Sequence, residues 1–541
     1  MHAEGRDAEP GAVPRKVHLI ALALVLLLGA ALRFYDISGV PSELIVDELD
    51  LYNSVQSIAT TGHDVDGKLL PFLYSPFTRN PPVYGVASYA SSLVFGKTPF
   101  GLRFPAVVFG LVAVALMYAI AWELTRRRDV ALATAALQAT QPIFVHFSRV
   151  AWEPASELPF LVGGLYALLR AFRPADETDA TSVRIHPGWL ALGALLLGLT
   201  SYTYMAGWFY AVALGGAILA LNAGRLRSWD ACAKVLGAIA LWGAISAPAL
   251  WMWFGDPATY GKAQRIGTFS QGVSWSALGV FAANYLKHFS WSYLVATGDP
   301  QPGVTWRYLV GFGAFYWWVM PLAIFGLVWG SGYVRTRWGF LWLLTWLAVY
   351  PLGGALTNEG APNAPRTLAG APVFCILAAL GVAMLLDVAR SLRPRRLARA
   401  AVPVVALVLA ANLAVSVVLF SITYFTQYVH VYSNAWDSGT GAMFAAIRER
   451  SAGYSRVCFA VWPAWYGLDT YVRYYLGDVP IEKIGNVTDA ACYLPGTLVA
   501  TDADHPLKRR GFVVVARVVD VSGSPFAFVS ANRRTLLPPQ R

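Results

Sequence analysis

Long apolar stretches constrain this chain more than any other feature of its sequence. The hydrocarbon core of a bilayer is about 30 Å thick, so a helix that crosses it needs about 20 mostly apolar residues. With 56% hydrophobic and only 13% charged residues, the chain could not cover itself with a polar surface in water. We therefore expect a polytopic α-helical membrane protein with about eleven transmembrane helices. The predicted spans are 17–34, 104–123, 129–146, 155–172, 188–204, 207–222, 233–253, 309–330, 338–356, 366–388 and 400–420.

The positive charges alternate between the two sides of these spans. The first span follows Arg15 and Lys16 and lacks a clear small-x-small cleavage site, so we expect an anchor and not a cleaved signal. If residues 1–16 form a cytoplasmic tail, the basic residues gather in cytoplasmic loops, as the positive-inside rule requires. The formal charge of +11 is then a topology signal, and we expect no nucleic-acid partner. The basic loop positions are 126–128, 170, 173, 184, 225, 227, 234, 335, 337, 390, 393, 395, 396 and 399.

This topology divides the chain into a membrane domain and an outer tail. Residues 17–420 form the membrane domain, with large outer loops at 35–103 and 254–308. In the tail, 421–541, apolar runs at 457–461, 497–500 and 512–516 predict strands of a small extracytoplasmic α/β domain. Cys458 and Cys492 both lie in this tail, where an oxidising compartment would permit a disulfide, but the sequence leaves their pairing open. We expect a multi-pass protein of the plasma (inner) membrane.

Three carboxylates stand directly after the first span, at Asp47, Glu48 and Asp50. Carboxylates crowded near a membrane surface repel one another, which raises their proton affinity and suits a general base or a metal ligand. A solvated loop start or an acidic helix N-terminus explains the same spacing equally well. The spacing alone leaves both interpretations open.

A second polar group in the first outer loop consists of His63, Asp64 and Asp66. These residues are of the types that form a hard-metal or acid/base cluster, and a divalent metal therefore stays open as a cofactor. Glycines flank the aspartates, however, and this pattern is more typical of turns. A turn is the favoured interpretation.

The segment between the third and fourth spans carries His146, Arg149 and Glu153. Charged groups between two apolar helices are costly unless they pair or serve a site. An Arg149–Glu153 pair four residues apart would be a purely structural explanation. We favour a functional role for Glu153, because this turn is predicted on the same side as Asp47.

Arg366 stands at the outer mouth of a predicted span, next to a potential helix N-terminus. A guanidinium in this position would hold a lipid phosphate well. Snorkelling of the side chain to lipid headgroups is the alternative. Tyr202, Tyr204 and Trp208 stand at another outer boundary, where an aromatic belt is favoured over sugar stacking.

In their order and sidedness these segments resemble the GT-C membrane glycosyltransferases. More narrowly, the chain is similar to the bacterial family 39-like group related to protein O-mannosyltransferases and lipid A aminoarabinose transferases. The resemblance covers roughly residues 15–420 and implies the GT-C fold and a sugar transfer with inversion from a polyprenyl-phosphate donor. The segments that carry it are 47–48, 62–68, 80–84, 102–105, 146–149, 201–204 and 363–366.

The resemblance also implies roles for individual residues. Asp47 would be the base that deprotonates an acceptor hydroxyl, and Glu48 and Glu153 would orient the acceptor or support the charge around the site. Arg366 and Arg149 would steady the departing lipid phosphate. The residues expected to contact the acceptor or the sugar are His63, Asp64, Tyr84, His146 and Tyr204.

The chain departs from the family pattern at the donor phosphate. Relatives often carry a Lys just before the first-loop proline, whereas this chain has Asn80 there, with Arg79 beside it. Either Arg79 takes over this contact or the donor headgroup is held differently. The expected partners are thus a polyprenyl-phosphate sugar, a lipid, glycan or protein acceptor, and membrane lipids.

Two other functions remain open at this stage. An oligosaccharyltransferase of the same fold would carry a Trp-Trp-Asp-type motif, but the tail has only Ala435-Trp436-Asp437, with a single Trp. A lipid flippase or transporter would place charges near the midplane of its spans and would contain repeated halves. The acidic residues of this chain instead gather at outer span ends, and we find no internal repeat.

Overall fold

The computed structural model covers residues 1–541. It describes residues 15–65, 67, 81–172, 185–255, 264, 266–299, 312–358, 360–460, 467–477, 479, 484–486, 490–504, 507 and 511–532.

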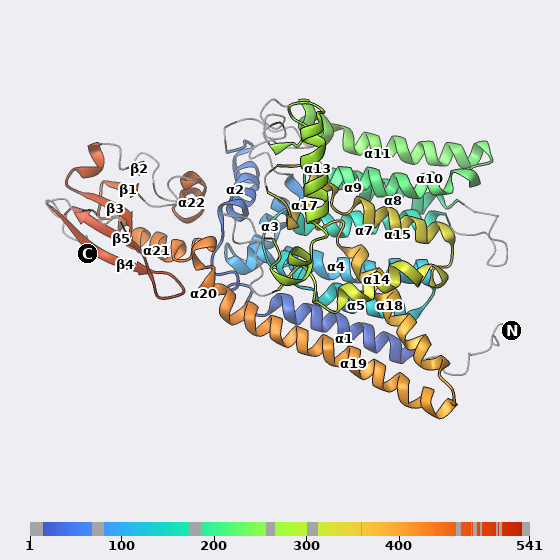
Figure 1. Ribbon diagram of the computed structural model, residues 1–541. Helices are drawn as coiled ribbons and strands as arrows, with labels where there is room; N and C mark the ends of the chain where they lie inside the picture. The colour runs from blue at the N-terminus through green and yellow to red at the C-terminus, as the bar shows by residue number, and fades with distance from the viewer. Residues whose placement is uncertain are drawn as a thin grey trace.

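Helices dominate the chain, and Figure 1 shows most of them gathered in one bundle. The first half contains α1 (Arg15–Phe34), α2 (Val46–Thr61), α3 (Pro82–Phe95), α4 (Pro99–Thr125), α5 (Arg128–Thr140), α6 (Pro142–Phe147), α7 (Pro154–Ala171), α8 (Pro187–Leu199), η1 (Thr200–Tyr202), α9 (Gly207–Tyr210), η2 (Ala211–Gly215), α10 (Gly216–Asn222), η3 (Ala223–Arg225) and α11 (Trp229–Gly255). The second half contains α13 (Trp275–Lys287), η4 (Ser292–Ala296), α14 (Val319–Trp329), η6 (Gly330–Tyr333), α15 (Arg337–Val349), α16 (Leu352–Ala355), α17 (Ala364–Thr367), α18 (Pro372–Ser391), α19 (Arg395–Ile422), η7 (Thr423–Tyr428), α20 (Val429–Val431), η8 (Ser433–Trp436), α21 (Thr440–Ser451), α22 (Leu468–Tyr475) and η11 (Ala490–Tyr493).

Seven helical stretches among the described residues are long and apolar enough to cross a membrane, and two shorter apolar stretches accompany them. The seven are Lys16–Phe34, Pro99–Thr125, Gly207–Arg225, Trp229–Gly255, Arg337–Ala355, Pro372–Ser391 and Arg395–Val431, and the shorter two are Pro187–Tyr202 and Val319–Tyr333. These nine overlap nine of the predicted spans, which confirms a multi-pass membrane protein. The predicted spans 129–146 and 155–172 correspond to α5 with α6 and to α7, which are not among the nine.

Proline explains the division of the predicted span 129–146. Pro142 lacks a backbone N–H, and it begins α6 after Gln141 has adopted an extended conformation. The same preference of proline for the first turn of a helix begins α4 at Pro99, α7 at Pro154 and α18 at Pro372. These helix starts can therefore be predicted from the local sequence.

Close helix packing inside the bundle depends on small residues. A Cβ added at Gly326 of α14 would lie 1.9 Å from the Leu377 carbonyl oxygen, and one at Gly381 of α18 would lie 2.3 Å from the Leu322 carbonyl oxygen. Only the missing side chains let these two backbones approach so closely. This is the usual way in which membrane helices gain contact area without a hydrophobic driving force between them.

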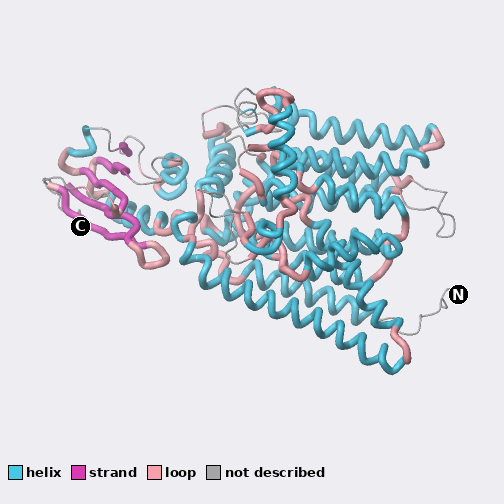
Figure 2. Tube along the Cα trace, in the orientation of Figure 1, coloured by secondary structure: helices cyan, strands magenta, loops and turns pink. Residues whose placement is uncertain are grey.

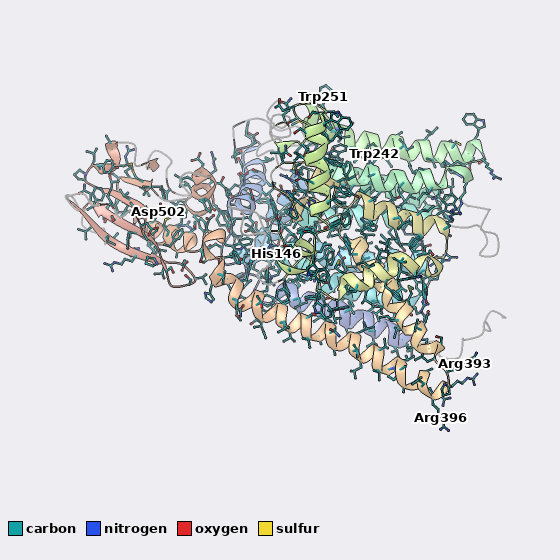
Figure 3. All side chains as sticks on the ribbon, viewed as in Figure 1. His146, Trp242, Trp251, Arg393, Arg396 and Asp502 are labelled. Atoms are coloured by element: carbon teal, nitrogen blue, oxygen red, sulfur yellow. A yellow bond between two sulfur atoms is a disulfide. The ribbon has the colours of Figure 1, made fainter. Side chains whose placement is uncertain are left out.

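One end of the bundle carries a network of opposite charges. Arg127 donates to Asp129 and Asp387, each at 2.6 Å, and Arg390 pairs with Asp387. Loops that the charge pattern assigns to one side of the membrane therefore meet in space. Figure 3 shows Arg393 and Arg396 at one end of the molecule and Asp502 at the other.

The strands all belong to the C-terminal region, as Figure 2 shows. They are β1 (Arg456–Ala460), β2 (Ile484–Asn486), β3 (Thr497–Asp502), β4 (Phe512–Val519) and β5 (Pro525–Asn532), in the order β2-β1-β3-β5-β4. β1 pairs in parallel with β2 and β3, and β5 pairs antiparallel with β3 and β4. The three predicted strand runs are confirmed as β1, β3 and β4, and Cys458 forms a disulfide with Cys492.

Candidate functional site

A buried ion pair joins α2 to α4. Arg103 Nε and Nη2 donate to Glu48 Oε1 and Oε2 at 2.9 and 3.1 Å, and both side chains are fully buried. The carboxylate also accepts from the backbone N–H groups of Ile45, at 3.0 Å, and Ala151, at 2.7 Å. Arg103 donates further to three backbone carbonyls between residues 37 and 43. Each carboxylate oxygen of Glu48 thus accepts two hydrogen bonds. These contacts hold the side chain in place and are typical of a positioning residue.

Asp47 occupies the neighbouring position in the first turn of α2 but faces a different environment. Its side chain is partly exposed, whereas that of Glu48 is fully buried. The N-terminal turn of a helix stabilises a negative charge. Of these two adjacent carboxylates, Asp47 is therefore the one that a substrate can reach.

The short helix α22 of the C-terminal region packs against α2 beside Asp47, and Figure 1 shows the two helices next to each other. A Cβ added at Gly467, just before α22, would lie 2.4 Å from Val46 Cγ2. Tyr471 Oη donates to Asp437 Oδ2 at 2.6 Å. Burial, with the charges of Asp437 and Asp47, raises the pKa of Tyr471 well above its usual value. Tyr471 thus remains a neutral hydrogen-bond donor near Asp47.

Glu43 makes a second connection between the first outer loop and the C-terminal region. Its carboxylate accepts from the backbone N–H of Gly441 at 3.3 Å and from Tyr475 Oη at 3.5 Å. Burial raises the pKa of Glu43 although these hydrogen bonds oppose the shift. Glu43, Tyr471 and Tyr475 are not among the predicted site residues. The sequence does not indicate these contacts, because about 400 residues separate Glu43 from its partners.

The turn between α6 and α7 holds Arg149 in contacts with the backbone, and the expected role of Arg149 in binding the donor phosphate stays a prediction. Its Nη1 and Nη2 donate to the carbonyls of residues 32, 33, 36 and 40 at 2.7 to 3.2 Å. Its guanidinium also lies 4.8 Å from the Phe425 ring centre. These are the contacts of a cap on the C-terminal end of α1. Glu153, buried at the start of α7, follows two residues after Ala151, which donates to Glu48.

His146 lies in an aromatic cluster in the middle of the molecule, where Figure 3 labels it. Its Nδ1 is 2.9 Å from Tyr424 Oη, and its ring meets those of Tyr424, Tyr428 and Trp436 edge to face. The side chain is fully buried. The cluster ties α6 to the segment that leads into the C-terminal region. A contact of His146 with the acceptor stays a prediction.

The other residues expected to contact the acceptor are dispersed. Tyr84 is fully buried and donates to the Leu102 carbonyl at 3.0 Å, which makes it a link between α3 and α4 and not a surface for a sugar. His63 is exposed and its Nδ1 is 2.9 Å from the Thr61 carbonyl oxygen, as the turn interpretation predicts, while Asp64 is buried. Tyr204 packs against Trp152, with ring centres 6.4 Å apart. Arg79 lies outside the described residues.

Arg366 is held by a web of hydrogen bonds around the short helix α17. Its Nη1 donates to Thr357 Oγ1 at 2.6 Å, and its backbone N–H donates to Asn363 Oδ1 at 3.2 Å. The loop 254–308 supplies two further supports. His288 Nε2 accepts from the Asn363 N–H at 3.0 Å, and Asp299 Oδ2 accepts from the Ala364 N–H at 3.0 Å.

The state of His288 follows from its two hydrogen bonds. Nε2 accepts, so Nδ1 carries the proton and donates to the Asn284 carbonyl at 2.7 Å. Burial, with a contribution from Lys287, lowers the pKa of His288 to about 4. The imidazole is therefore neutral at neutral pH. This neutral state is what lets it hold the Asn363 backbone.

A continuous line of contacts connects the region of Asp47 with Arg366. Ala151 donates to Glu48, and the next residue, Trp152, packs against Tyr204. Six residues further on, Tyr210 Oη donates to the Arg366 carbonyl at 3.1 Å. The predicted base and the predicted phosphate ligand thus belong to one packed unit.

Among the described residues, no group of three or more His, Cys, Asp or Glu side chains is arranged to hold a metal ion. His63 and Asp64 are not part of such a group within the described part of the chain. Asp66, the third member of the predicted cluster, lies outside the described residues.

Part of the chain matches a family of known proteins. The family model described as dolichyl-phosphate-mannose-protein mannosyltransferase matches residues 23–247. No curated protein sequence matches the chain. The match relates the region that contains α2, α4 and the turn before α7 to this family of glycosyltransferases.

Two solved structures resemble the chain over nearly its whole length. ArnT from Cupriavidus metallidurans bound to undecaprenyl phosphate is 13% identical, with a TM-score of 0.58 over 98% of this chain and 100% of that one. The archaeal oligosaccharyltransferase AglB from Archaeoglobus fulgidus, in complex with an inhibitory peptide and a dolichol-phosphate, is 14% identical, with a TM-score of 0.55 over 90% of this chain and 69% of that one. These likenesses confirm the predicted GT-C fold and the predicted relation to the GT-C superfamily.

The substitution Glu48→Gln should destabilise the protein strongly. It leaves the buried Arg103 guanidinium without its counter-charge, and breaking a buried pair in this way costs about 3–5 kcal/mol. We expect a clear fall in the melting temperature of the purified protein in detergent. Glu449→Gln, at an exposed pair with Arg450, is the control and should cost about 1 kcal/mol or less. A Glu48→Gln protein that is as stable as the wild type would contradict the positioning role.

Stability should also fall as the pH is lowered from about 6.5 to about 4. In this window the unfolded chain protonates His288 while the folded protein does not, so protonation favours unfolding by roughly 3 kcal/mol in total. Melting temperatures measured from pH 7.5 to 4.5 should fall less steeply for His288→Phe than for the wild type. His430→Phe, at an exposed position, should keep the wild-type slope. Equal slopes for all three proteins would refute the assignment.

Proposed function

We propose that this protein is an inverting glycosyltransferase that moves a sugar from a polyprenyl-phosphate donor to an acceptor at the outer face of the plasma membrane. The observation that carries the proposal is the position of Asp47. It is a partly exposed carboxylate in the first turn of α2, and a buried Glu48–Arg103 pair fixes that turn. The likeness to a structure bound to undecaprenyl phosphate supports a lipid-phosphate donor.

In this mechanism Asp47 removes the proton from the acceptor hydroxyl as that oxygen attacks the anomeric carbon of the donor. The lipid phosphate leaves from the opposite side, which inverts the configuration. Tyr471 lies near Asp47 and donates its hydroxyl proton to Asp437, so its oxygen is placed to accept a hydrogen bond from the acceptor. Glu153 orients the acceptor from the neighbouring turn. Glu48 acts only through the position of α2.

Arg366 stabilises the negative charge that develops on the leaving phosphate. A guanidinium that is held in advance costs no reorganisation when the charge forms. Thr357, Asn363 and, through Asn363, His288 provide that hold. Arg79 remains a candidate for a second phosphate contact.

The proposed topology places the N-terminus in the cytoplasm and the C-terminal region outside. The basic residues around Arg127 and Arg396 lie at the end of the bundle away from the sheet, in accord with the positive-inside rule. The Cys458–Cys492 disulfide lies in the sheet region, and disulfides persist in oxidising compartments. Both observations support the same orientation.

The structure of the tail favours this function over an oligosaccharyltransferase. Trp436, the single Trp of the Ala-Trp-Asp segment, is fully buried and donates to Tyr428 Oη at 3.0 Å. A side chain in that position belongs to the aromatic cluster and does not present itself to an acceptor peptide.

Removal of the base should abolish transfer without loss of donor binding. Asp47→Asn should lower kcat by about 10²- to 10⁴-fold, the usual contribution of a general base. The measurement is transfer of radiolabelled sugar from a panel of polyprenyl-phosphate sugars by purified protein, with polyprenyl-phosphate binding measured in parallel. Asp230→Asn, at an exposed pair with Lys234, is the control. Full activity of Asp47→Asn would eliminate the assigned base.

Loss of the phosphate ligand should instead weaken the donor. Arg366→Gln should weaken polyprenyl-phosphate binding about 10-fold or more, because a hydrogen bond to a charged group contributes about 1.5–3 kcal/mol. Arg337→Gln is the matched control. Arg337 is exposed and begins α15, whereas Arg366 lies beyond the C-terminal end of that helix. Unchanged affinity in Arg366→Gln would show that the phosphate is held elsewhere.

A further inference from the structure

The helix α13 carries an apolar face on the surface of the protein. Trp275 and Leu286, near the two ends of the helix, are 89% and 66% exposed, and Leu278 between them is exposed as well. Gly279 and Ala282 complete the row, and the spacing of these positions puts them on one side of the helix. A continuous exposed apolar face of this kind marks a contact with a membrane or with another molecule.

The bundle next to α13 has an exposed apolar surface of its own. Trp251 and Phe254, near the end of α11, are both exposed, and Figure 3 labels Trp251. The helix α11 is one of the stretches that can cross a membrane, and few of its residues are buried inside the protein. Trp side chains gather where a membrane helix passes from hydrocarbon to headgroups. The end of α11 thus has the composition of a membrane boundary.

The length and direction of α13 fit a helix that lies on this boundary and does not cross the membrane. Figure 1 shows α13 at the end of α8, α11 and α15 that faces the C-terminal sheet, and running across their direction. Its 13 residues rise about 20 Å, which is less than the hydrocarbon thickness of about 30 Å. A short helix with one apolar face, lying in the plane of the interface, is the usual form of a membrane-surface helix.

The opposite face of α13 supports the segment that carries Arg366. Asn284 Nδ2 donates to the Thr357 carbonyl at 3.3 Å, and His288, the next residue after the helix, accepts from the Asn363 N–H at 3.0 Å. Thr357 and Asn363 are the residues that hold the Arg366 side chain and backbone. One short helix therefore lies between the exposed apolar face and the proposed phosphate ligand.

We infer that α13 inserts its apolar face among the lipids of the leaflet next to the C-terminal region, and that this contact sets the position of Arg366. Lys287, the only charged residue of α13, is exposed at its end and can bind lipid phosphates there. The membrane contact does not depend on any enzymatic activity. Its coupling to donor binding rests on the proposed function, because it uses the phosphate role of Arg366.

The membrane contact is tested with a nitroxide spin label on the full-length protein, in nanodiscs of phosphatidylethanolamine and phosphatidylglycerol. The label is attached at Leu286→Cys, an exposed position at which the protein should still fold. Cys232→Ala and Cys375→Ala first remove the free thiols, and Cys458 and Cys492 do not react because they form a disulfide. Collisions with oxygen, which dissolves in hydrocarbon, are compared with collisions with a water-soluble nickel chelate.

Two further labelled positions calibrate this comparison. Leu407→Cys, exposed on the apolar helix α19, is the lipid-facing reference, and Asp469→Cys, exposed on α22, is the water-facing reference. We expect the label at Leu286→Cys to favour oxygen, as at Leu407→Cys. A preference for the nickel chelate, as at Asp469→Cys, would overturn the inference because the face would lie in water. Protection from both reagents would overturn it too, because another protein surface would then cover the face.

Donor binding tests the coupling to Arg366. Leu286→Glu places a carboxylate on the membrane-facing side and should weaken polyprenyl-phosphate binding in the same nanodiscs about 5-fold or more, the lower end of usual coupling between two sites. Val513→Glu, at an exposed position of β4, is the control and should bind as the wild type does. Equal binding by all three proteins would overturn the coupling. A wild type that binds no polyprenyl phosphate would instead contradict the proposed function, and the spin labels would still decide the membrane contact.

Discussion

The ion pair between Glu48 and Arg103 is the interaction on which the end of the bundle next to the C-terminal region depends. Two charges with no exposed surface are tolerated only when each is fully hydrogen-bonded, and here the pair also gathers backbone groups from the first outer loop and from the turn before α7. This hydrogen-bonded ion pair fixes α2, α4 and that turn relative to one another. The ion pair also fixes the position of the neighbouring residue Asp47, which is partly exposed. The loop 254–308 gives Arg366 a comparable support through His288 and Asp299.

Much of this organisation is legible in the sequence. The apolar runs indicate the bundle because hydrocarbon imposes length and hydrophobicity on each helix, and three of the five strands are visible as short apolar runs. The adjacent carboxylates 47–48 are likewise visible. The sequence does not reveal which of the two faces inward, because that depends on Arg103, 55 residues away.

Other contacts could not be predicted, because the partner has no residue-specific signature in the sequence. Arg149 looks like a phosphate ligand, but it is satisfied by backbone carbonyls at the end of α1, and any sequence supplies such carbonyls. Tyr84 looks like a sugar contact but donates to a carbonyl of α4. Glu43 and Tyr471 reach the site only because the C-terminal region folds back over the first outer loop. Contacts of such long sequence separation follow from tertiary structure and not from local spacing.

The helix α22 makes the surroundings of Asp47 depend on the C-terminal region. Its eight residues place Tyr471 near Asp47, and Tyr471, Val472 and Tyr474 pack in the same hydrophobic core as the bundle. Asp469 and Arg473 of the same helix are exposed, so substitutions there leave this packing in place. The two kinds of position lie within one short helix, which joins the packing of the C-terminal region to the geometry around the proposed base.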